Sequence, residues 1–116
     1  FKQFLATATP DDEQKKDIDF LMSLGEIFTL VVYGQLMLEE ARLQGLEADL
    51  IDQIFDVMVR DFSKFAVELY GKQSSTPKQM EYCLKMIKKS AADKRRYENI
   101  WTDHVHALKD TYVMNE

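Results

Sequence analysis

The sequence of 116 residues contains one cysteine, two histidines, two prolines and four glycines. The single cysteine, Cys83, excludes a disulfide within the chain and leaves no cysteine cluster that could bind zinc. We therefore expect a cytoplasmic protein. The sequence also lacks a glycine-rich phosphate loop, a Walker motif and a dinucleotide-binding fingerprint, so no nucleotide site is predicted.

Basic residues are outnumbered: 15 lysines and arginines stand against 20 acids, giving a net charge of −5. This balance argues against a nucleic acid as the main partner. The contents of 46% hydrophobic and 30% charged residues are typical of a folded soluble domain, and the length suits a single core. Because the chain starts at Phe1 rather than methionine, we expect it to be part of a longer protein.

Apolar residues recur at helical spacing throughout, and no strand-like alternation lasts for more than a few residues. The pattern predicts an all-α fold, an antiparallel up-and-down helical bundle of three to four helices. Residues 1–10 are expected to be a linker from a missing N-terminal part. Residues 11–116 are expected to form a single helical bundle domain.

The first two helix boundaries have clear signals. Thr9–Asp12 offers a cap, a proline and two acids, so the first helix is expected to run from there to about Leu43. Gly45 is the expected left-handed stop of that helix. The second helix is expected from Ala48 to Gly71, with its apolar residues on one face.

Thr76 and Gln79 predict a capping box at the start of a short third helix. The segment Ser90–Asp93 resembles another cap, so a fourth helix is expected to start there. A single kinked helix from Thr76 onward is the competing interpretation. The predicted apolar stripe of the fourth helix consists of Tyr97, Ile100, Trp101, His104, Val105, Leu108 and Tyr112.

The segment Ile27–Leu38 carries no charge and poses the question of a membrane span. Its twelve residues would form a helix of about 18 Å, well short of a hydrocarbon core of about 30 Å. Gly25 and Gly34 point to opposite sides of that helix, whereas Gly34 and Ala41 share a side. We therefore predict a packing seam at these three positions, on a helix that is covered on two faces.

Few residues could carry chemistry. Asp103, His104 and His106 lack the paired Glu-x-x-His motifs of a di-iron bundle, and His104 is better explained as a core or interface histidine. Cys83 lies on an apolar stripe and is expected to be an inert thiol. Glu26 is expected to be a solvated residue at the edge of the uncharged segment. No catalytic, cofactor-binding or metal-binding residue is assigned.

The charge is distributed unevenly. Residues 72–96 hold eight basic residues and two acids, a balance of +6, whereas the rest of the chain has a balance of −11. Cations at the start of a helix are mildly unfavourable, so an anionic group is a candidate neighbour for the basic residues that open the fourth helix. The residues proposed for contact with an anion or a partner are Lys88, Lys89, Lys94, Arg95 and Arg96.

Several strings together carry a family resemblance: "SLGEIFTLVVYGQLMLEEARLQG", "DLIDQIFDVMVRDFSKFAVELY", "CLKMIKK" and "HALKDTYVMNE". From about Asp17 to Glu116 the chain resembles the C-terminal end of bacterial acyl-CoA dehydrogenases, in the long form that carries an extra helical domain. The resemblance rests on overall similarity and on no catalytic motif.

The resemblance implies a parent flavoenzyme that oxidises acyl-CoA thioesters across the α–β bond with FAD. The catalytic base and the FAD-binding segments of that family lie outside the matching region, so no catalytic residue is carried over. The implied role is an accessory domain that packs on the catalytic domain of the same chain and supports a homo-oligomer. The alternatives are a stand-alone helical adaptor and a peripheral membrane-docking domain, both using the basic segment Lys88–Arg96.

Overall fold

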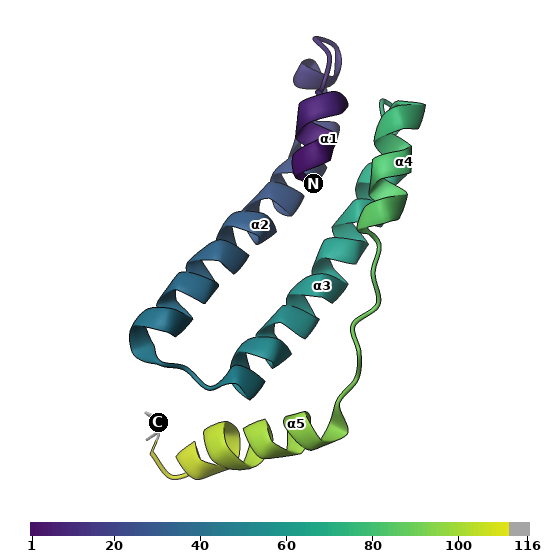
Figure 1. Ribbon diagram of the computed structural model, residues 1–116. Coiled ribbons are helices and arrows are strands. Elements are labelled where there is room, and N and C mark those ends of the chain that lie inside the picture. Colours follow the sequence, from purple (N-terminus) through teal and green to yellow (C-terminus); the bar gives the residue numbers. More distant parts are fainter. Residues whose placement is uncertain (112–116) are drawn as a thin grey trace, which may run out of the picture.

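The computed structural model describes residues 1–111, which contain five α-helices and no strand (Figure 1). The helices are α1 (Lys2–Thr7), α2 (Ile18–Gln44), α3 (Ala48–Tyr70), α4 (Pro77–Met86) and α5 (Lys94–Ile100). The predicted all-α, antiparallel helical bundle is confirmed. α2 and α3 form a long hairpin, α4 runs back along one half of α3, and α5 lies across the other end (Figure 1).

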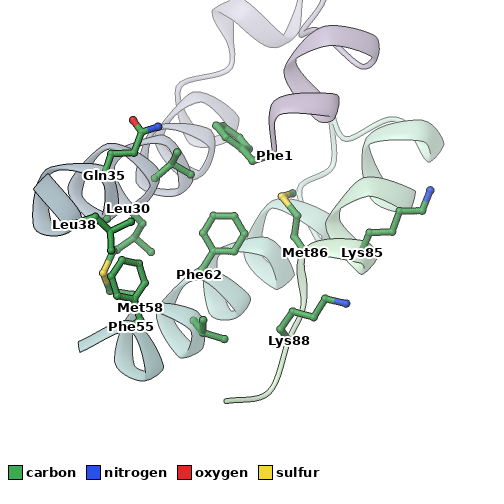
Figure 2. Close-up of a pocket in the computed structure, with 13 residues that line it drawn as sticks. Phe1, Leu30, Gln35, Leu38, Phe55, Met58, Phe62, Lys85, Met86 and Lys88 are labelled. Atoms are coloured by element: carbon green, nitrogen blue, oxygen red, sulfur yellow. The ribbon is translucent and has the colours of Figure 1, made fainter. Parts of the chain in front are cut away.

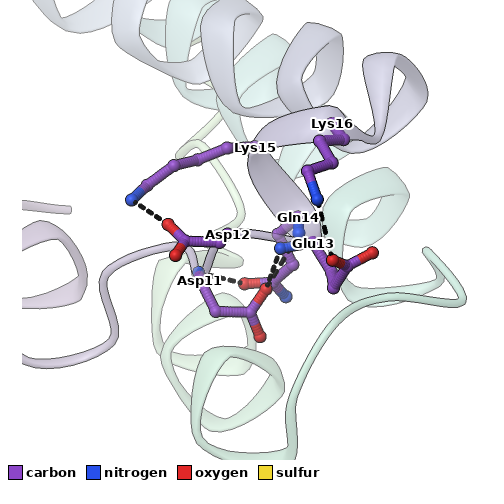
Figure 3. Close-up of polar contacts among 6 residues, drawn as sticks. All are labelled: Asp11, Asp12, Glu13, Gln14, Lys15 and Lys16. Carbon is purple, nitrogen blue, oxygen red and sulfur yellow. Dashed lines mark hydrogen bonds and ion pairs between the residues drawn. The ribbon is translucent and has the colours of Figure 1, made fainter.

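The start of α2 differs from the prediction. The helix begins at Ile18, because the Asp17 side chain accepts a hydrogen bond from the backbone N–H of Phe20 at 3.1 Å. Asp11 forms a separate turn, since its carboxylate accepts the backbone N–H groups of Glu13 and Gln14 (Figure 3). Asp11 and Asp12 therefore belong to this turn, which leads into a 3₁₀ turn over residues 14–16, and they do not begin α2.

Residues 1–10, expected to be a linker, contain α1 and contribute to the core. Phe4 is fully buried and meets the ring of Tyr82 on α4 edge to face, with 6.3 Å between ring centroids. The hydroxyl groups of Thr7 and Tyr82 are hydrogen-bonded at 2.7 Å. Phe4 lies six residues before Pro10, and this was too weak a signal to predict α1 from the sequence. The burial of Phe4 depends on α4, which is distant in the sequence.

The other helix ends follow the sequence closely. Gly45 has φ +63° and ends α2, as predicted, and Thr76 and Gln79 form the predicted capping box with Pro77 in the first turn. Residues 87–93 are non-helical, and Asp93 caps α5 by accepting from the backbone N–H of Arg96. The competing single kinked helix is therefore excluded.

A buried pair of amides joins the ends of three segments. Gln79 donates to the carbonyl of Ala8 at 3.0 Å, and its Oε1 accepts from Gln14 Nε2 at 2.7 Å. Gln14 Nε2 also donates to the carbonyl of Ser74. Both glutamines are buried, so these bonds satisfy polar groups that water cannot reach. The pair ties the 3₁₀ turn and the end of α1 to the start of α4.

The main core lies where α1 and α4 join the hairpin. It consists of Phe4, Phe20, Ile27, Ala66, Leu69, Cys83 and Met86. Farther along the hairpin, Gly34 and Ala41 are buried in α2. A Cβ atom built on Gly34 would lie 3.2 Å from the Met58 methyl group and 3.4 Å from the Phe55 ring. Gly25 instead faces open space, with no atom within 4 Å of such a Cβ.

Replacing Gly34 with leucine should destabilise the hairpin by about 1–3 kcal/mol, because the larger side chain would displace Met58 and Phe55. Gly25→Ala should stabilise the monomer by up to about 1 kcal/mol, because alanine favours the helix and nothing obstructs it. Urea denaturation followed by circular dichroism measures both. Equal stability of Gly34→Leu and the unmodified chain would contradict the close α2–α3 contact.

Candidate functional site

The described residues contain no group of three or more metal-ligating side chains. His104 lies in a π-helical turn (Trp101–Val105) that continues α5, and its Nε2 is 3.1 Å from Glu47 Oε2. Asn99 donates to Asp49 at 3.4 Å, also at the start of α3. We call α5 and the turns that follow it, up to Leu108, the C-terminal helical segment. His104 is therefore a half-buried histidine with one carboxylate partner, where this segment contacts the start of α3.

Cys83 is fully buried between α3 and α4 in the main core. Burial raises the pKa of its thiol to about 11, because a thiolate would lose its hydration there. The thiol therefore remains protonated at neutral pH and is a poor nucleophile. Glu26 is exposed, as expected of a solvated residue.

Arg96 differs from the other members of the basic segment. Its guanidinium forms an ion pair with Asp56 of α3, and the two side chains are 13% and 25% exposed. Arg96 Nε is buried and has no hydrogen-bond partner among the described residues. Arg96 thus fastens α5 to α3, and this contact gives a structural reason for a cation at the start of the helix.

The remaining basic residues, Lys88, Lys89, Lys94 and Arg95, are exposed. Lys94 lies 3.5 Å from Glu98 of the same helix. The backbone of Lys88 is held by Ser63, whose hydroxyl donates to its carbonyl at 2.6 Å and accepts from its N–H at 2.8 Å. These two bonds hold the backbone of Lys88 beside α3, and the side chains of the four basic residues remain exposed.

The predicted apolar stripe of the fourth helix is not buried by this chain. No residue of α5 or of the following turns is buried, and Tyr97, Trp101, Val105 and Leu108 are all exposed. Only Ile100 and His104 of that stripe are half-buried, and Tyr112 lies outside the described residues. The sequence showed an apolar face correctly, and the polar contacts of this segment with α3 and its N-cap residue include Arg96–Asp56, Asn99–Asp49 and His104–Glu47.

An open apolar groove of about 470 Å³ runs between α2, α3 and α4 (Figure 2). Its lining includes Leu30, Gly34, Leu38, Phe55, Met58, Phe62 and Met86. Lys85 and Lys88 lie at one edge, and their ammonium groups point away from the rings of Phe55 and Phe62 (Figure 2). The Lys85 ammonium lies over the ring of Tyr82, 5.2 Å from its centroid. No acid or nucleophile lines this groove, so its chemistry is that of a packing surface.

The length argument against a membrane span needs correction. The uncharged segment is part of a helix of 27 residues, about 40 Å long, and α2 is sufficiently long and apolar to cross a membrane. However, α2 packs along α3, whose Arg60 and Lys64 side chains are largely exposed. Their charges would have to enter the hydrocarbon with α2, which is costly. The packing therefore favours a bundle helix.

No protein-family model, no curated protein and no solved structure matches the chain.

Substituting Arg96 with methionine should destabilise the chain by about 1–3 kcal/mol, because Asp56 would lose its partner. The double variant Arg96→Met/Asp56→Leu should recover much of that loss. Denaturation measures stability, and the anisotropy of Trp101, the one tryptophan, reports whether the C-terminal helical segment detaches. If Arg96→Met changes neither quantity, Arg96 is a free surface cation.

Native Cys83 should react negligibly with Ellman's reagent at neutral pH, because it is buried and its pKa is raised to about 11. One thiol per chain should react after unfolding in guanidinium chloride, which serves as the internal control. Rapid stoichiometric reaction of the native chain would show that the α3–α4 contact opens readily.

Proposed function

We propose that this chain is the C-terminal accessory helical domain of an acyl-CoA dehydrogenase family flavoprotein. The parent enzyme would oxidise acyl-CoA thioesters with FAD bound outside these residues. The domain's own role would be assembly: packing on the catalytic domain of the same chain and supporting a homo-oligomer. The sequence strings given above support the proposed family, and the surface of the structure supports the proposed role.

The observation that carries the proposed role is the large apolar surface that the chain leaves uncovered. Most of the exposed large apolar residues lie on α2, and another set lies on α5 and the turns after it. An apolar surface of this extent is typical of a chain that packs against another folded unit. A packing surface of this kind supports an accessory role.

The adaptor and membrane-docking alternatives depend on the basic segment, and the structure gives them less support. Arg96 forms an ion pair with Asp56 within the fold, and Lys94 lies beside Glu98. The cations left to attract an anionic partner are Lys88, Lys89 and Arg95. Isolated surface cations of this kind contribute weakly and are screened by salt.

The test uses the complete protein encoded by the gene that contains these residues. It should purify with bound flavin, visible in its absorption spectrum, and should reduce an artificial electron acceptor when given acyl-CoA thioesters of several chain lengths. A matched variant that lacks residues 1–116 should retain flavin but form a smaller or less stable assembly. Purification without flavin, together with no reaction with any acyl-CoA, would overturn the proposal.

A further inference from the structure

The side of α2 that faces away from its buried residues carries a regular pattern that the monomer leaves exposed, although Met22, Gly25 and Thr29 at its edge border an open depression that Phe65 of α3 also lines. Its six positions are Ile18, Met22, Gly25, Thr29, Val32 and Leu36, and all six are exposed. The exposed fractions of the four large apolar residues are 73% for Ile18, 64% for Met22, 36% for Val32 and 57% for Leu36. We call these six residues the outer face of α2.

The spacing of the outer face alternates between four and three residues. This is the heptad spacing of a helix that packs against another helix, with an average of about 3.5 residues per turn. The buried side of α2 uses a different set, which includes Ile27, Gly34 and Ala41. Gly34 lies against Met58 and Phe55 of α3. The outer face is therefore a second helix-packing stripe on the same helix.

We propose that the outer face of α2 pairs with the same face of a second copy, antiparallel and related by a two-fold axis. The axis would pass between residues 25 and 29. Ile18 would then lie level with Leu36 of the second copy, and Met22 with its Val32. The two small residues, Gly25 and Thr29, would face each other at the centre. This pairing deepens the assembly role proposed above and rests on it.

A second copy fits because the stripe is complementary to itself. A two-fold interface places the same patch on both sides, so each large residue must meet a residue that can pack with it. The antiparallel pairing matches large apolar residues at both ends and small residues at the centre. Because nothing lies within 4 Å of a Cβ at Gly25, the two helices can approach closely there.

The estimated contact area limits the pairing to a weak, reversible dimer. The stripe from residue 18 to 36 is about 30 Å long and about 10 Å wide, giving about 600 Å² for both copies together before side chains interdigitate. Stable interfaces usually bury about 1,200–2,000 Å² in total. The pairing should therefore depend on protein concentration in the isolated chain.

The charged residues beside the outer face of α2 favour a second copy of the chain over a lipid surface as its binding partner. Glu26 flanks the stripe, and the only basic residue of α2 is Arg42. An anionic membrane would be repelled by such a face, since interfacial helices carry lysine or arginine beside their apolar face. Two copies would bring their Glu26 side chains near each other, so added salt should strengthen the pairing by screening this repulsion.

The experiment measures the oligomeric state of the full 116-residue chain by sedimentation equilibrium at several concentrations and two salt levels. A monomer–dimer equilibrium that tightens with salt is expected. Gly25→Gln should raise the dissociation constant at least tenfold while keeping the helical signal and keeping or raising the melting temperature of the monomer, because its side chain enters open space within one copy and glutamine favours the helix more than glycine does. Arg60→Gln, which places the same side chain on the exposed side of α3, is the matched control.

Single-cysteine substitutions test the direction of the pairing. When Met22→Cys and Val32→Cys chains are mixed and oxidised, the mixed disulfide should dominate, because residue 22 lies about 15 Å from its own equivalent in the antiparallel pair. Cys83 is buried and can remain in place. Dominant 22–22 and 32–32 disulfides would overturn the antiparallel arrangement, and a chain that is monomeric at every concentration would overturn the dimer. Neither result bears on flavin binding by the complete protein, which tests the proposed function separately.

Discussion

The arrangement of this domain depends on α2 being apolar on more than one side. The chain covers only the side that faces α3, where Gly34 allows Met58 and Phe55 to come close. No other described helix is long enough to cover the opposite side, so Met22, Tyr33 and Leu36 remain exposed. This uncovered apolar face on the longest described helix is the observation on which the association proposed above rests.

α1 and α4 pack at one end of the α2–α3 hairpin, and α5 lies across the other end (Figure 1). At the end with α1 and α4, the buried amides of Gln14 and Gln79 connect α1, the 3₁₀ turn and α4, and Phe4 completes the core. At the other end, α5 contains no buried residue and is held by contacts such as Arg96 with Asp56. Stability is therefore expected to be concentrated at the end with α1 and α4, with a less firmly held C-terminal helical segment.

The helix boundaries that depend on local chemistry were predictable. Gly45 at positive φ and the Thr76–Gln79 capping box involve bonds between residues that are close in sequence. The sequence left a break before Asp93 and a kinked helix as alternatives, and the structure shows the break. The start of α2 was missed because two acidic segments compete for the same role, and Asp17 rather than Asp11 caps the helix. The role of Arg96 was missed because its partner, Asp56, lies forty residues away in the chain.

By itself, the sequence determined that the protein is an all-α bundle, where most of its helices end, and that α2 and α5 carry apolar faces. Those features follow from periodicity and from backbone hydrogen bonds made within a few residues. Only the tertiary structure decided that Phe4 is buried, that the stripe through Trp101 is exposed, and that Gly34 is packed whereas Gly25 is free. Periodicity shows that a face is apolar, but what covers it depends on helices that approach from distant parts of the chain.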